Sequence, residues 1–470
     1  MILKKTHGKI LAAALALALS LLCAEGADVA LEGKFANAFG WTDTGMKLKR
    51  SEIAKISADA EGPDASAKFM RGVMLYRAYL AEARDVPSAV RLFRESAELG
   101  SPCGMAAYAA CLLNGDASDP DPKKADSLFK KSAAAGCALA VRYVGEGLLK
   151  SARTLDMQMG VEFLKSAEAL GDVYSKTILA SCYDRGIGVP SDPGESARLL
   201  KEAADAGNAP ALFAMGMLAS RRGEDARTVF RLYEKAAMMK YPPALSALGV
   251  CYLYGAGVPA DYGRAVSYLE LAAAEGVAGA QNALGVCYAN GAGVEQDPGR
   301  AFEWFKRAAQ LGDAEAQNNL GNCYYFGKGA PEDAGQAHKW FRLAAAQGNA
   351  SAQSSLALLY LEGKAQKRDA KDAVVWLLKA AEGGDVEAQS NLGRCLLEGI
   401  GTETNYPLAV KWLALAAEKD DAQALGNLGG CYYLGLGVEK DLEKAKELLK
   451  KAAKLGNDEA RKAYWRISDE

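Results

Sequence analysis

Histidine is nearly absent from this sequence: its 470 residues include two, His7 and His338. Imidazole is the usual general base near neutral pH and the commonest metal ligand. If His7 lies in a cleaved segment, no histidine pair is left to hold zinc, and a Ser-His-Asp arrangement would depend on His338 alone. We interpret His338, between Ala337 and Lys339, as a solvated residue on a helix face. We therefore predict neither a metal nor a cofactor.

An excess of either charge is also missing. The chain has 56 Lys+Arg and 58 Asp+Glu, which gives a formal net charge of −2. Without a basic surplus there is no electrostatic reason to expect nucleic acid or an anionic membrane surface as a partner. With 50% hydrophobic and 24% charged residues, the composition is that of a folded protein with a core, and it rules out intrinsic disorder.

Long apolar runs are confined to the start of the chain. Three lysines precede an apolar run over residues 10–22, which is the order and length of a secretory signal peptide and too short to span a bilayer. The small residues Ala24 and Gly26 predict cleavage after Gly26, so residues 1–26 would be removed. Lipid attachment at Cys23 is disfavoured because Leu22 before it is bulky. We predict an exported protein, periplasmic or secreted, without an integral membrane segment.

The rest of the chain repeats itself about every 36 residues. Turn residues recur in steps of 36 at Gly276, Gly312, Gly348, Gly384, Asp420 and Gly456. Earlier turns fall at Gly100, Gly136, Gly171, Gly207 and Tyr241, in steps of 36, 35, 36 and 34. Gly62 opens a first unit. A period of this length is typical of one supersecondary unit in a repeat protein.

Each unit carries two helical patterns. A first stripe of small and apolar residues at i, i+4, i+7 and i+8 consists of Ala316, Leu320, Cys323 and Tyr324, and Gly327 and Gly329 end that helix. A second stripe consists of Ala337, Trp340, Phe341, Ala344 and Ala345, and it stops at Gly348. Neither helix can bury its stripe alone, so successive units must stack. Eleven helix pairs fit between Gly62 and Gly456.

The segment AQNALGVCYANGAGVEQDPGRAFEWFKRAAQLG, residues 280–312, resembles the Sel1-like repeat family, a relative of the tetratricopeptide repeat with a longer, glycine-rich loop between the helices. The resemblance covers residue 62 to the end, although the units near Gly136 and Gly207 lack the GxG loop. It implies an all-α fold, a right-handed α/α superhelix (solenoid) of about eleven repeats. We expect a lead or capping segment over 27–61 with a helix near 47–58, the repeat array over 62–455, and a C-terminal capping helix over 456–470.

Three columns of repeated residues are interpreted as packing residues. The Trp column is Trp304, Trp340, Trp376 and Trp412, and the Tyr column is Tyr183, Tyr252, Tyr288, Tyr324, Tyr360 and Tyr432. Large aromatic residues at regular helical positions favour contacts between repeats. The Leu-Gly pairs at 248–249, 284–285, 320–321 and 428–429 place a glycine inside the first helix at a cost of about 1 kcal/mol each. A cost repeated so regularly implies close contact between helices.

The ten cysteines do not form a regular disulfide framework. Seven of them share one position of the first helix: Cys111, Cys182, Cys251, Cys287, Cys323, Cys395 and Cys431. Equivalent positions on stacked helices lie about 8–10 Å apart, beyond the Cα limit of about 7 Å for a disulfide. A cysteine-rich secreted branch of the family staples each unit at two positions, where this sequence has Ala309 and Gln317. We predict buried thiols, with a bridge between Cys103 and Cys137 left open.

Motifs for catalysis are scarce. The sequence has no C-x-x-C, P-loop or dinucleotide GxGxxG motif. Some relatives in the cysteine-rich branch are labelled penicillin-binding or β-lactamase-like, and Ser127 and Lys130 match the S-x-x-K signature. However, Leu128 takes the Trp-column position of that helix, and neither an S-D-N nor a K-T-G motif is present. We interpret the match as chance and predict that the protein is not an enzyme.

A stacked helical array offers an extended surface for another protein. We therefore predict a monomeric adaptor or scaffold of bacterial type that binds a protein or peptide partner of unknown identity through the concave surface of its first helices. The alternatives are a penicillin-binding or β-lactamase-like envelope protein and a secreted virulence effector. Candidate partner-binding residues are those on the first helices outside the packing columns: Asn282, Asn318, Asn322, Tyr325, Arg394 and Tyr433.

Overall fold

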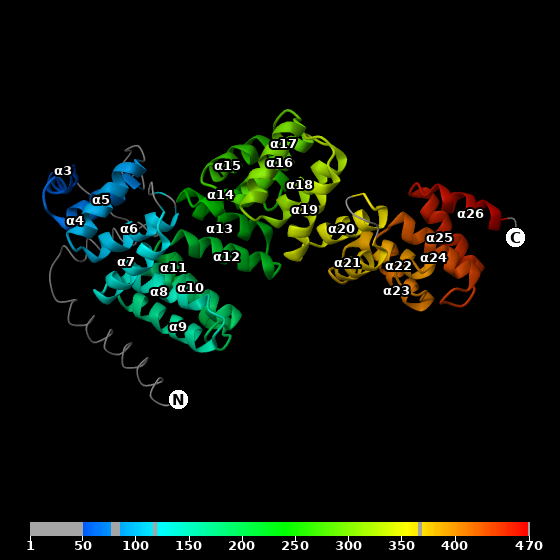
Figure 1. Ribbon diagram of the computed structural model, residues 1–470, viewed down its shortest axis with the longest axis horizontal. Coiled ribbons are helices and arrows are strands. Elements are labelled where there is room, and N and C mark those ends of the chain that lie inside the picture. The colour runs from blue at the N-terminus through cyan, green and yellow to red at the C-terminus, as the bar shows by residue number, and fades with distance from the viewer. Residues whose placement is uncertain (1–49, 77–84, 115, 117–119, 365–368, 469–470) are drawn as a thin grey trace. The chain divides into compact units, whose positions relative to one another are not determined.

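The computed structural model describes residues 50–76, 85–114, 116, 120–364 and 369–468. These residues form 24 α-helices and no strand (Figure 1). The chain divides into two compact units, the first over 1–251 and 255–259 and the second over 252–254 and 260–470. The expected signal peptide over 1–26 lies outside the described residues, as does most of the lead segment over 27–61. The helix expected near 47–58 is present at residues 50–59.

The helices follow one another with short connections. In the first half of the chain they are α3 (Arg50–Asp59), α4 (Ala65–Tyr76), α5 (Val86–Glu98), α6 (Pro102–Asn114), α7 (Pro122–Ala134), α8 (Ala138–Leu149), α9 (Thr154–Ala169), α10 (Val173–Arg185), α11 (Pro193–Asp205), α12 (Ala209–Arg221), α13 (Ala226–Met238) and α14 (Pro242–Tyr254). They continue with α15 (Tyr262–Ala274), α16 (Ala278–Asn290), α17 (Pro298–Gln310), α18 (Ala314–Phe326), α19 (Ala334–Ala346), α20 (Ala350–Glu362), α21 (Ala370–Glu382), α22 (Val386–Glu398), α23 (Tyr406–Ala417), α24 (Ala422–Leu434), α25 (Leu442–Lys454) and α26 (Asp458–Ser468).

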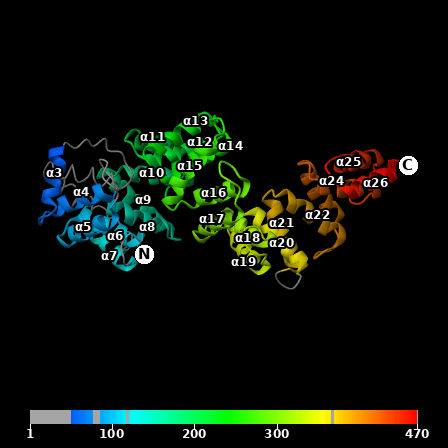
Figure 2. The same cartoon turned by 90° about the horizontal axis from the view of Figure 1, so that it is seen from above.

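The helices pack in the order of the sequence. Even-numbered helices are the first helices of the repeats, and within each unit they pack against the odd-numbered second helix that follows, as α18 does against α19 (Figures 1 and 2). Within each unit, second helices also pack against the next first helix, which stacks one repeat on another. Leaving out α3 and α26, the helices make eleven pairs, which confirms the all-α solenoid and its predicted repeat number.

Local sequence fixes where the helices begin and end. Aspartates before the second helices act as N-caps: the side chain of Asp333 accepts a hydrogen bond of 2.9 Å from the amide of Gln336. The second glycine of the loop has a different task. Gly329 has a φ of 77°, and a Cβ there would collide with the carbonyl oxygen of Pro298 in the preceding second helix. The GxG loop therefore lets the backbones of successive repeats touch.

One turn differs from the sequence prediction. The turn residue before α14 was placed at Tyr241, but the left-handed conformation belongs to Lys240, with a φ of 57°, and Tyr241 is the N-cap of α14. Asp420 takes the same conformation, with a φ of 62°. The step from Lys240 to Gly276 is 36 residues, so the regular register begins one repeat earlier than the glycines alone indicate.

The glycine inside the first helix makes room for the core. A Cβ on Gly321 would lie 2.5 Å from the ring of Phe341, which is 1% exposed. Gly285 and Phe305 form the same pair, as do Gly393 and Leu413. This confirms the predicted close contact between the two helices of a repeat.

The Trp column lies at the seam between repeats. Trp340 is half-buried and packs against a core cluster that contains Phe302 and Phe305 of the preceding repeat. Trp376 and Trp412 also pack with residues of the preceding repeat, which confirms the predicted inter-repeat packing for these three tryptophans. The outer side of the column carries cations, such as Lys379, whose Nζ lies 4.4 Å from the ring centroid of Trp376.

A ladder of glutamines, which we did not predict, joins the repeats of the second unit. The Nε2 atoms of Gln281, Gln317, Gln353 and Gln389 donate to the carbonyl oxygens of Ala273, Ala309, Ala345 and Ala381 over 3.2–3.3 Å. All four glutamines are buried. Because a buried amide without a partner is costly, each glutamine fixes its first helix to the second helix before it.

The two repeats without the GxG loop are complete helix pairs, α8–α9 and α12–α13. In α8–α9, Gly145 and Gly160 face each other: a Cβ on Gly145 would lie 3.0 Å from the carbonyl oxygen of Gly160, and one on Gly160 would lie 2.8 Å from that of Gly145. Gly160 stands where other repeats have an alanine such as Ala337. The two helices therefore meet backbone to backbone.

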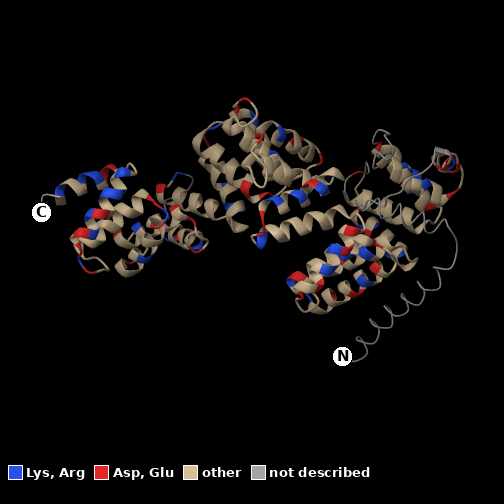
Figure 3. Ribbon diagram, turned by 180° about the vertical axis from the view of Figure 1, so that it is seen from behind, with Lys and Arg blue, Asp and Glu red and all other residues tan. Residues whose placement is uncertain are grey.

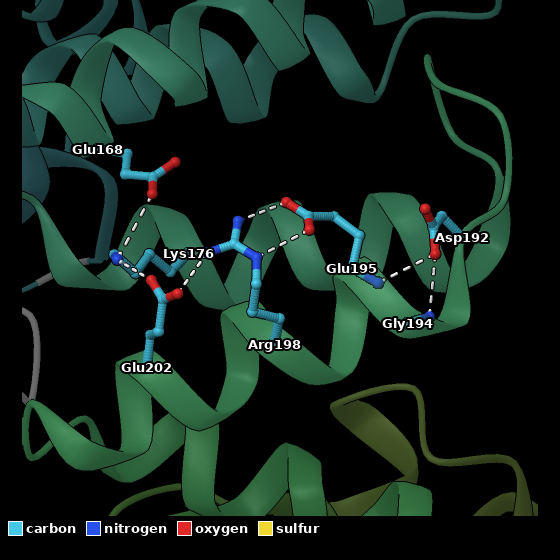
Figure 4. A network of polar contacts seen from close by, with 7 residues as sticks. All are labelled: Glu168, Lys176, Asp192, Gly194, Glu195, Arg198 and Glu202. Carbon is cyan, nitrogen blue, oxygen red and sulfur yellow. Dashed lines mark hydrogen bonds and ion pairs between the residues drawn. The ribbon is translucent and has the colours of Figure 1, made fainter.

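Polar contacts add to the packing of the first unit. Lys176 of α10 lies between Glu168 of α9 and Glu202 of α11, with Nζ–Oε distances of 3.5 and 2.5 Å (Figure 4). Arg198 extends this network, because it pairs with both Glu202 and Glu195. Exposed pairs of this kind contribute about 0–1 kcal/mol each. Both signs of charge are interspersed along each unit (Figure 3).

His338 corrects a prediction. It is only 9% exposed rather than solvated, and its Nε2 lies 3.1 Å from the hydroxyl of Tyr360 in α20. The buried face of α19, which carries Ala337 and Phe341, is wide enough to include His338 as well. Burial lowers the pKa of His338, and the nearby Arg342 adds to that shift.

Candidate functional site

The candidate site is one face of the first helices in the second unit. We define the first-helix face as the fifth, ninth and twelfth residues of α16, α18, α20, α22 and α24. Residues at these spacings lie on one side of a helix. The face consists of Asn282, Val286, Ala289, Asn318, Asn322, Tyr325, Ser354, Leu358, Leu361, Ser390, Arg394, Leu397, Gly426, Gly430 and Tyr433. All six predicted partner-binding residues belong to it.

Burial varies along this face. The fifth positions are mostly covered: Asn318 is 6% exposed, Ser354 2% and Ser390 4%. The hydroxyl of Ser390 donates to Asp421, the N-cap of the next first helix, over 2.8 Å. The ninth and twelfth positions are half-exposed. A partner on this face would therefore contact the residues at the ninth and twelfth positions, while most residues at the fifth position are buried.

The three predicted asparagines have different surroundings. Asn282 is half-buried, and its Oδ1 accepts a hydrogen bond of 2.9 Å from Nδ2 of Asn319, one repeat further on. Asn318 lies under the face, and its buried Oδ1 has no hydrogen-bond partner. Asn322 is half-exposed one turn along α18. Asn319, which we did not predict, is the residue that joins α18 to α16.

Tyr325 is held by residues of the following repeat. Its hydroxyl donates to Oε2 of Glu362 over 2.6 Å, and it accepts a hydrogen bond of 3.2 Å from Nζ of Lys364. The ammonium of Lys364 also lies 4.6 Å from the centroid of the Tyr325 ring. Burial and the carboxylate of Glu362 raise the pKa of Tyr325, so the phenol is neutral at physiological pH. The ring is fixed in position before any partner arrives.

The last two predicted residues lie further along the unit. Arg394 of α22 is 35% exposed, and its Nη1 lies 3.8 Å from Oε2 of Glu398 on the same helix. Tyr433 of α24 is half-buried beside Lys440, whose Nζ lies 5.3 Å from its ring centroid. Of the six residues, the structure groups Asn282, Asn318, Asn322 and Tyr325 on α16 and α18, and it leaves Arg394 and Tyr433 apart.

A pocket of about 360 Å³ opens at Tyr433, between α24 and α26. Its walls are Gln423, Gly426, Asn427, Gly430, Tyr433, Leu449, Asn457, Glu459, Ala460, Ala463, Arg466 and Ile467. This size lies within the range of about 300–1,000 Å³ that ligand pockets have. Small and apolar residues form much of the wall, while amides and one charge of each sign surround it.

Two glycines line this pocket, and one of them, Gly430, leaves it open. At the fifth and ninth positions of the first helix, α18 has Asn318 and Asn322, whereas α24 has Gly426 and Gly430. A Cβ on Gly430 would meet no atom within 4 Å, so the space above it is open. The Gly-Gly pair at 429–430 is the sequence signal that could have pointed to the pocket. The opposite wall could not be read from sequence, because it depends on how α26 packs.

The S-x-x-K match lies on a solvated surface. Ser127 and Lys130 are both exposed on α7, and Nζ of Lys130 donates to Asp126 over 2.6 Å rather than to Ser127. A nucleophile needs an activating partner within hydrogen-bond reach. Among the described residues, no group of three or more His, Cys, Asp or Glu side chains is placed to hold a metal ion. No described helix is long and apolar enough to cross a membrane.

The helix pairs and their GxG loops agree with a known repeat pattern. The Sel1 repeat pattern matches nine stretches: 65–101, 104–137, 174–208, 242–277, 278–313, 314–349, 350–385, 386–421 and 422–457. The chain belongs to the Sel1 repeat family. The α8–α9 and α12–α13 pairs fall between the matched stretches, so they keep the helix-pair structure although the pattern does not match them. Sel1 repeat proteins are generally scaffolds for protein interactions.

Curated relatives match only part of this Sel1 chain. The DAP3-binding cell death enhancer 1 of Mus musculus is 38% identical over 97 residues, which is 21% of this chain and 19% of the mouse protein. Chitin synthase regulatory factor 3 of Schizosaccharomyces pombe is 30% identical over 233 residues, which is 46% of this chain and 24% of the yeast protein. The aligned part thus spans about a fifth to a quarter of the length of these relatives.

A solved Sel1-type structure covers most of the chain. It is a protective antigen present in uropathogenic Escherichia coli strains, whose crystal structure displays an SLR fold. The two are 26% identical with a TM-score of 0.55, and the match covers 90% of this chain and 91% of the antigen. The likeness supports the Sel1 solenoid fold over nearly the whole length.

Proposed function

We propose that this Sel1 repeat protein is an exported scaffold that binds an extended segment of another protein along its first-helix face. The pocket between α24 and α26 would anchor that segment. The pocket carries the proposal because it lies at the end of a row of half-exposed side chains that includes Tyr325 and Arg394. Interfaces depend on a few well-packed anchors surrounded by polar contacts. The predicted signal peptide over residues 1–26 supports the exported location.

The walls of the pocket favour a bulky side chain with a polar neighbour. Leu449, Ala463 and Ile467 offer apolar contact, and Tyr433 adds an aromatic wall. Arg466 and Glu459 stand on α26, where they would bind polar groups that flank the anchor. Mixed charges along both units favour a protein over a polyanion as the partner.

Filling the pocket tests this proposal. Gly430→Leu places a side chain in open space without a backbone clash, and Gly279→Leu does the same on α16, far from the pocket in sequence. Peptides selected from a random displayed library on the wild-type chain would be titrated against both variants by calorimetry. We expect Gly430→Leu to weaken binding by about tenfold or more, which corresponds to about 1.4 kcal/mol.

Gly279→Leu is the matched control and should leave the affinity unchanged. Equal affinities for all three chains would contradict the pocket as the anchor. Export is tested on the same protein: the chain recovered outside the cytoplasm of a bacterial host should begin at Ala27, as measured by its intact mass. A chain that keeps residues 1–26 would contradict export by the predicted signal.

A further inference from the structure

Two cysteines of the first unit stand apart from the rest. Cys103 is the second residue of α6, and Cys137 is the N-cap of α8, the first helix of the next repeat. Their Sγ atoms lie 3.3 Å apart, and no disulfide joins them. A disulfide has a sulfur–sulfur bond of about 2.05 Å, so a relative movement of about 1.3 Å would close one. The contact therefore places two thiols from different repeats close enough to form a disulfide after a small movement.

The column cysteines have different surroundings. They are buried at one position of successive first helices, such as Cys182 at 1% exposed and Cys431 at 1% exposed. Burial raises the pKa of both thiols to about 11, and that of Cys111 to about 12. A thiol with a raised pKa and little exposure is inert toward thiol reagents. The column thus supplies internal controls within the same chain.

The position of Cys137 favours a thiolate. At the N-terminus of α8 it faces the amides of Leu139 and Ala140, and the thiol of Cys103 lies against it. The hydrogen bond from Cys103 and the amide of Ala140 lower the pKa of Cys137, although burial acts in the opposite direction. Helix N-termini stabilise negative charge. Both the short distance between the sulfurs and the lowered pKa of Cys137 therefore favour a reactive pair.

Access differs between the two thiols. Cys103 is half-buried and can meet a reagent from solvent, whereas Cys137 is 4% exposed behind it. We propose that Cys103 and Cys137 form an oxidisable pair that closes to a disulfide by exchange with a small-molecule disulfide. The site is a modification site and is independent of the proposed partner binding.

The exchange proceeds in two balanced steps. The two sulfurs share a proton, and when it lies on Cys137 the more accessible thiolate of Cys103 attacks one sulfur of the small disulfide RSSR. This forms a mixed disulfide on Cys103 and releases RS⁻, which takes up the proton of Cys137. The thiolate of Cys137 then attacks Sγ of Cys103, which forms the internal disulfide and releases the second RS⁻. Two protein thiols lose two electrons and two protons in total, and RSSR is reduced to two RSH.

The bond would link α6 directly to α8. In a repeat array each repeat contacts only its neighbours, so a covalent bond between first helices restrains their separation locally. The two helices already touch, so the link needs only a movement of about 1.3 Å between the two sulfurs. The pairing also differs from a staple within one repeat, because the two cysteines are 34 residues apart.

Oxidation of the full-length chain tests the inference. The purified protein is incubated with oxidised glutathione, alkylated with iodoacetamide and analysed by intact mass and peptide mapping. We expect the intact mass to fall by two hydrogens and the peptide map to contain a cross-linked peptide with Cys103 and Cys137. When the oxidised chain is unfolded and then alkylated, alkylation of this pair should be reduced by about tenfold. The column cysteines should remain fully alkylated under the same conditions.

Single variants separate the roles of the two thiols. Cys137→Ser should leave Cys103 carrying glutathione, because the resolving thiol is gone, and Cys103→Ser should remain without the cross-link. Cys111→Ser is the matched control on α6 and should oxidise like the wild type. The inference is overturned if the intact mass of the wild-type chain shows no loss of two hydrogens after treatment with oxidised glutathione, while circular dichroism shows that the protein is folded. It is equally overturned if the cross-link maps to column cysteines.

Discussion

In the second unit, Gly321 of α18 leaves room for the ring of Phe341, whereas in the α8–α9 pair of the first unit Gly145 and Gly160 meet each other with no room for a Cβ on either. Gly72 of the first unit likewise faces the ring of Phe93, so the backbone contact distinguishes the α8–α9 pair from the other repeats. Both solutions join a first helix to a second helix. Five successive repeats of the second unit match the Sel1 pattern, whereas the α8–α9 pair does not.

The two units also differ in their use of charge. Arg142 of α8 is 11% exposed, lies 3.7 Å from both Asp172 and Glu146, and stacks 4.4 Å from the ring centroid of Tyr174. The second unit uses the neutral glutamine ladder to join neighbouring repeats. A neutral amide is cheaper to bury than an ion. A repeat whose sequence has drifted from the common pattern can therefore still stack, but it depends on a specific ion pair.

Breaking that ion pair should give the largest effect. We expect Arg142→Met to lower the free energy of unfolding by about 3 kcal/mol, because Asp172, with a side chain 5% exposed, would lose its cation. Arg394→Met is the matched change in the second unit and should cost no more than about 0.5 kcal/mol, since that pair is exposed. Urea unfolding measures both. Equal losses would show that the two units do not differ in this respect.

The loop contact is the second test. Gly329→Ala introduces a Cβ at a positive φ and against the carbonyl oxygen of Pro298, so we expect a loss of about 2–3 kcal/mol. Gly223→Ala, between α12 and α13 of the first unit, has a φ of 69° but open space around it, and should cost about 1 kcal/mol. Thermal unfolding of both variants separates steric clash from backbone strain. A similar loss for both would contradict the tight loop contact of the regular repeats.

A change of pH should have the smallest effect on stability. The contributions of His338 in the second unit and Glu146 in the first unit should change in opposite directions as the pH falls. The pKa of His338 is lowered in the folded state, so the stability it contributes is present above its unfolded pKa of about 6.5 and is lost as the pH falls below it. Burial raises the pKa of Glu146 in the first unit, so its contribution instead falls as the pH rises above its ordinary value of 4.5.

His338→Gln keeps an amide next to Tyr360 but cannot gain a proton. Between pH 7.5 and pH 5.5, the wild-type chain should lose more stability than this variant, by less than about 1 kcal/mol because a single partnered group is involved. Melting curves at the two pH values measure the difference. An identical pH dependence in both chains would show that the buried histidine does not titrate in this range.

Sequence patterns predicted the helices well and the burial of single residues less well. The 36-residue register, the first and second helices and the close contact at Gly321 follow from periodicity and were confirmed. The sequence neighbours of His338 predict a solvated side chain, but Tyr360 of the next repeat covers it. All six predicted site residues lie on one face, yet Asn318 is buried under it. Local spacing fixes the side of a helix but not the depth of its cover.

The sequence by itself determined that the described chain is a stack of helix pairs, because each pair leaves an apolar stripe that only a neighbouring pair can bury. It also determined where most helices end, since Asp caps and loop glycines act within a few residues. Only the tertiary structure decided the pocket between α24 and α26, the buried cation Arg142, and the contact between Cys103 and Cys137. Each of these joins side chains about 30 or more residues apart, and their distances are set by how repeats pack rather than by any local spacing.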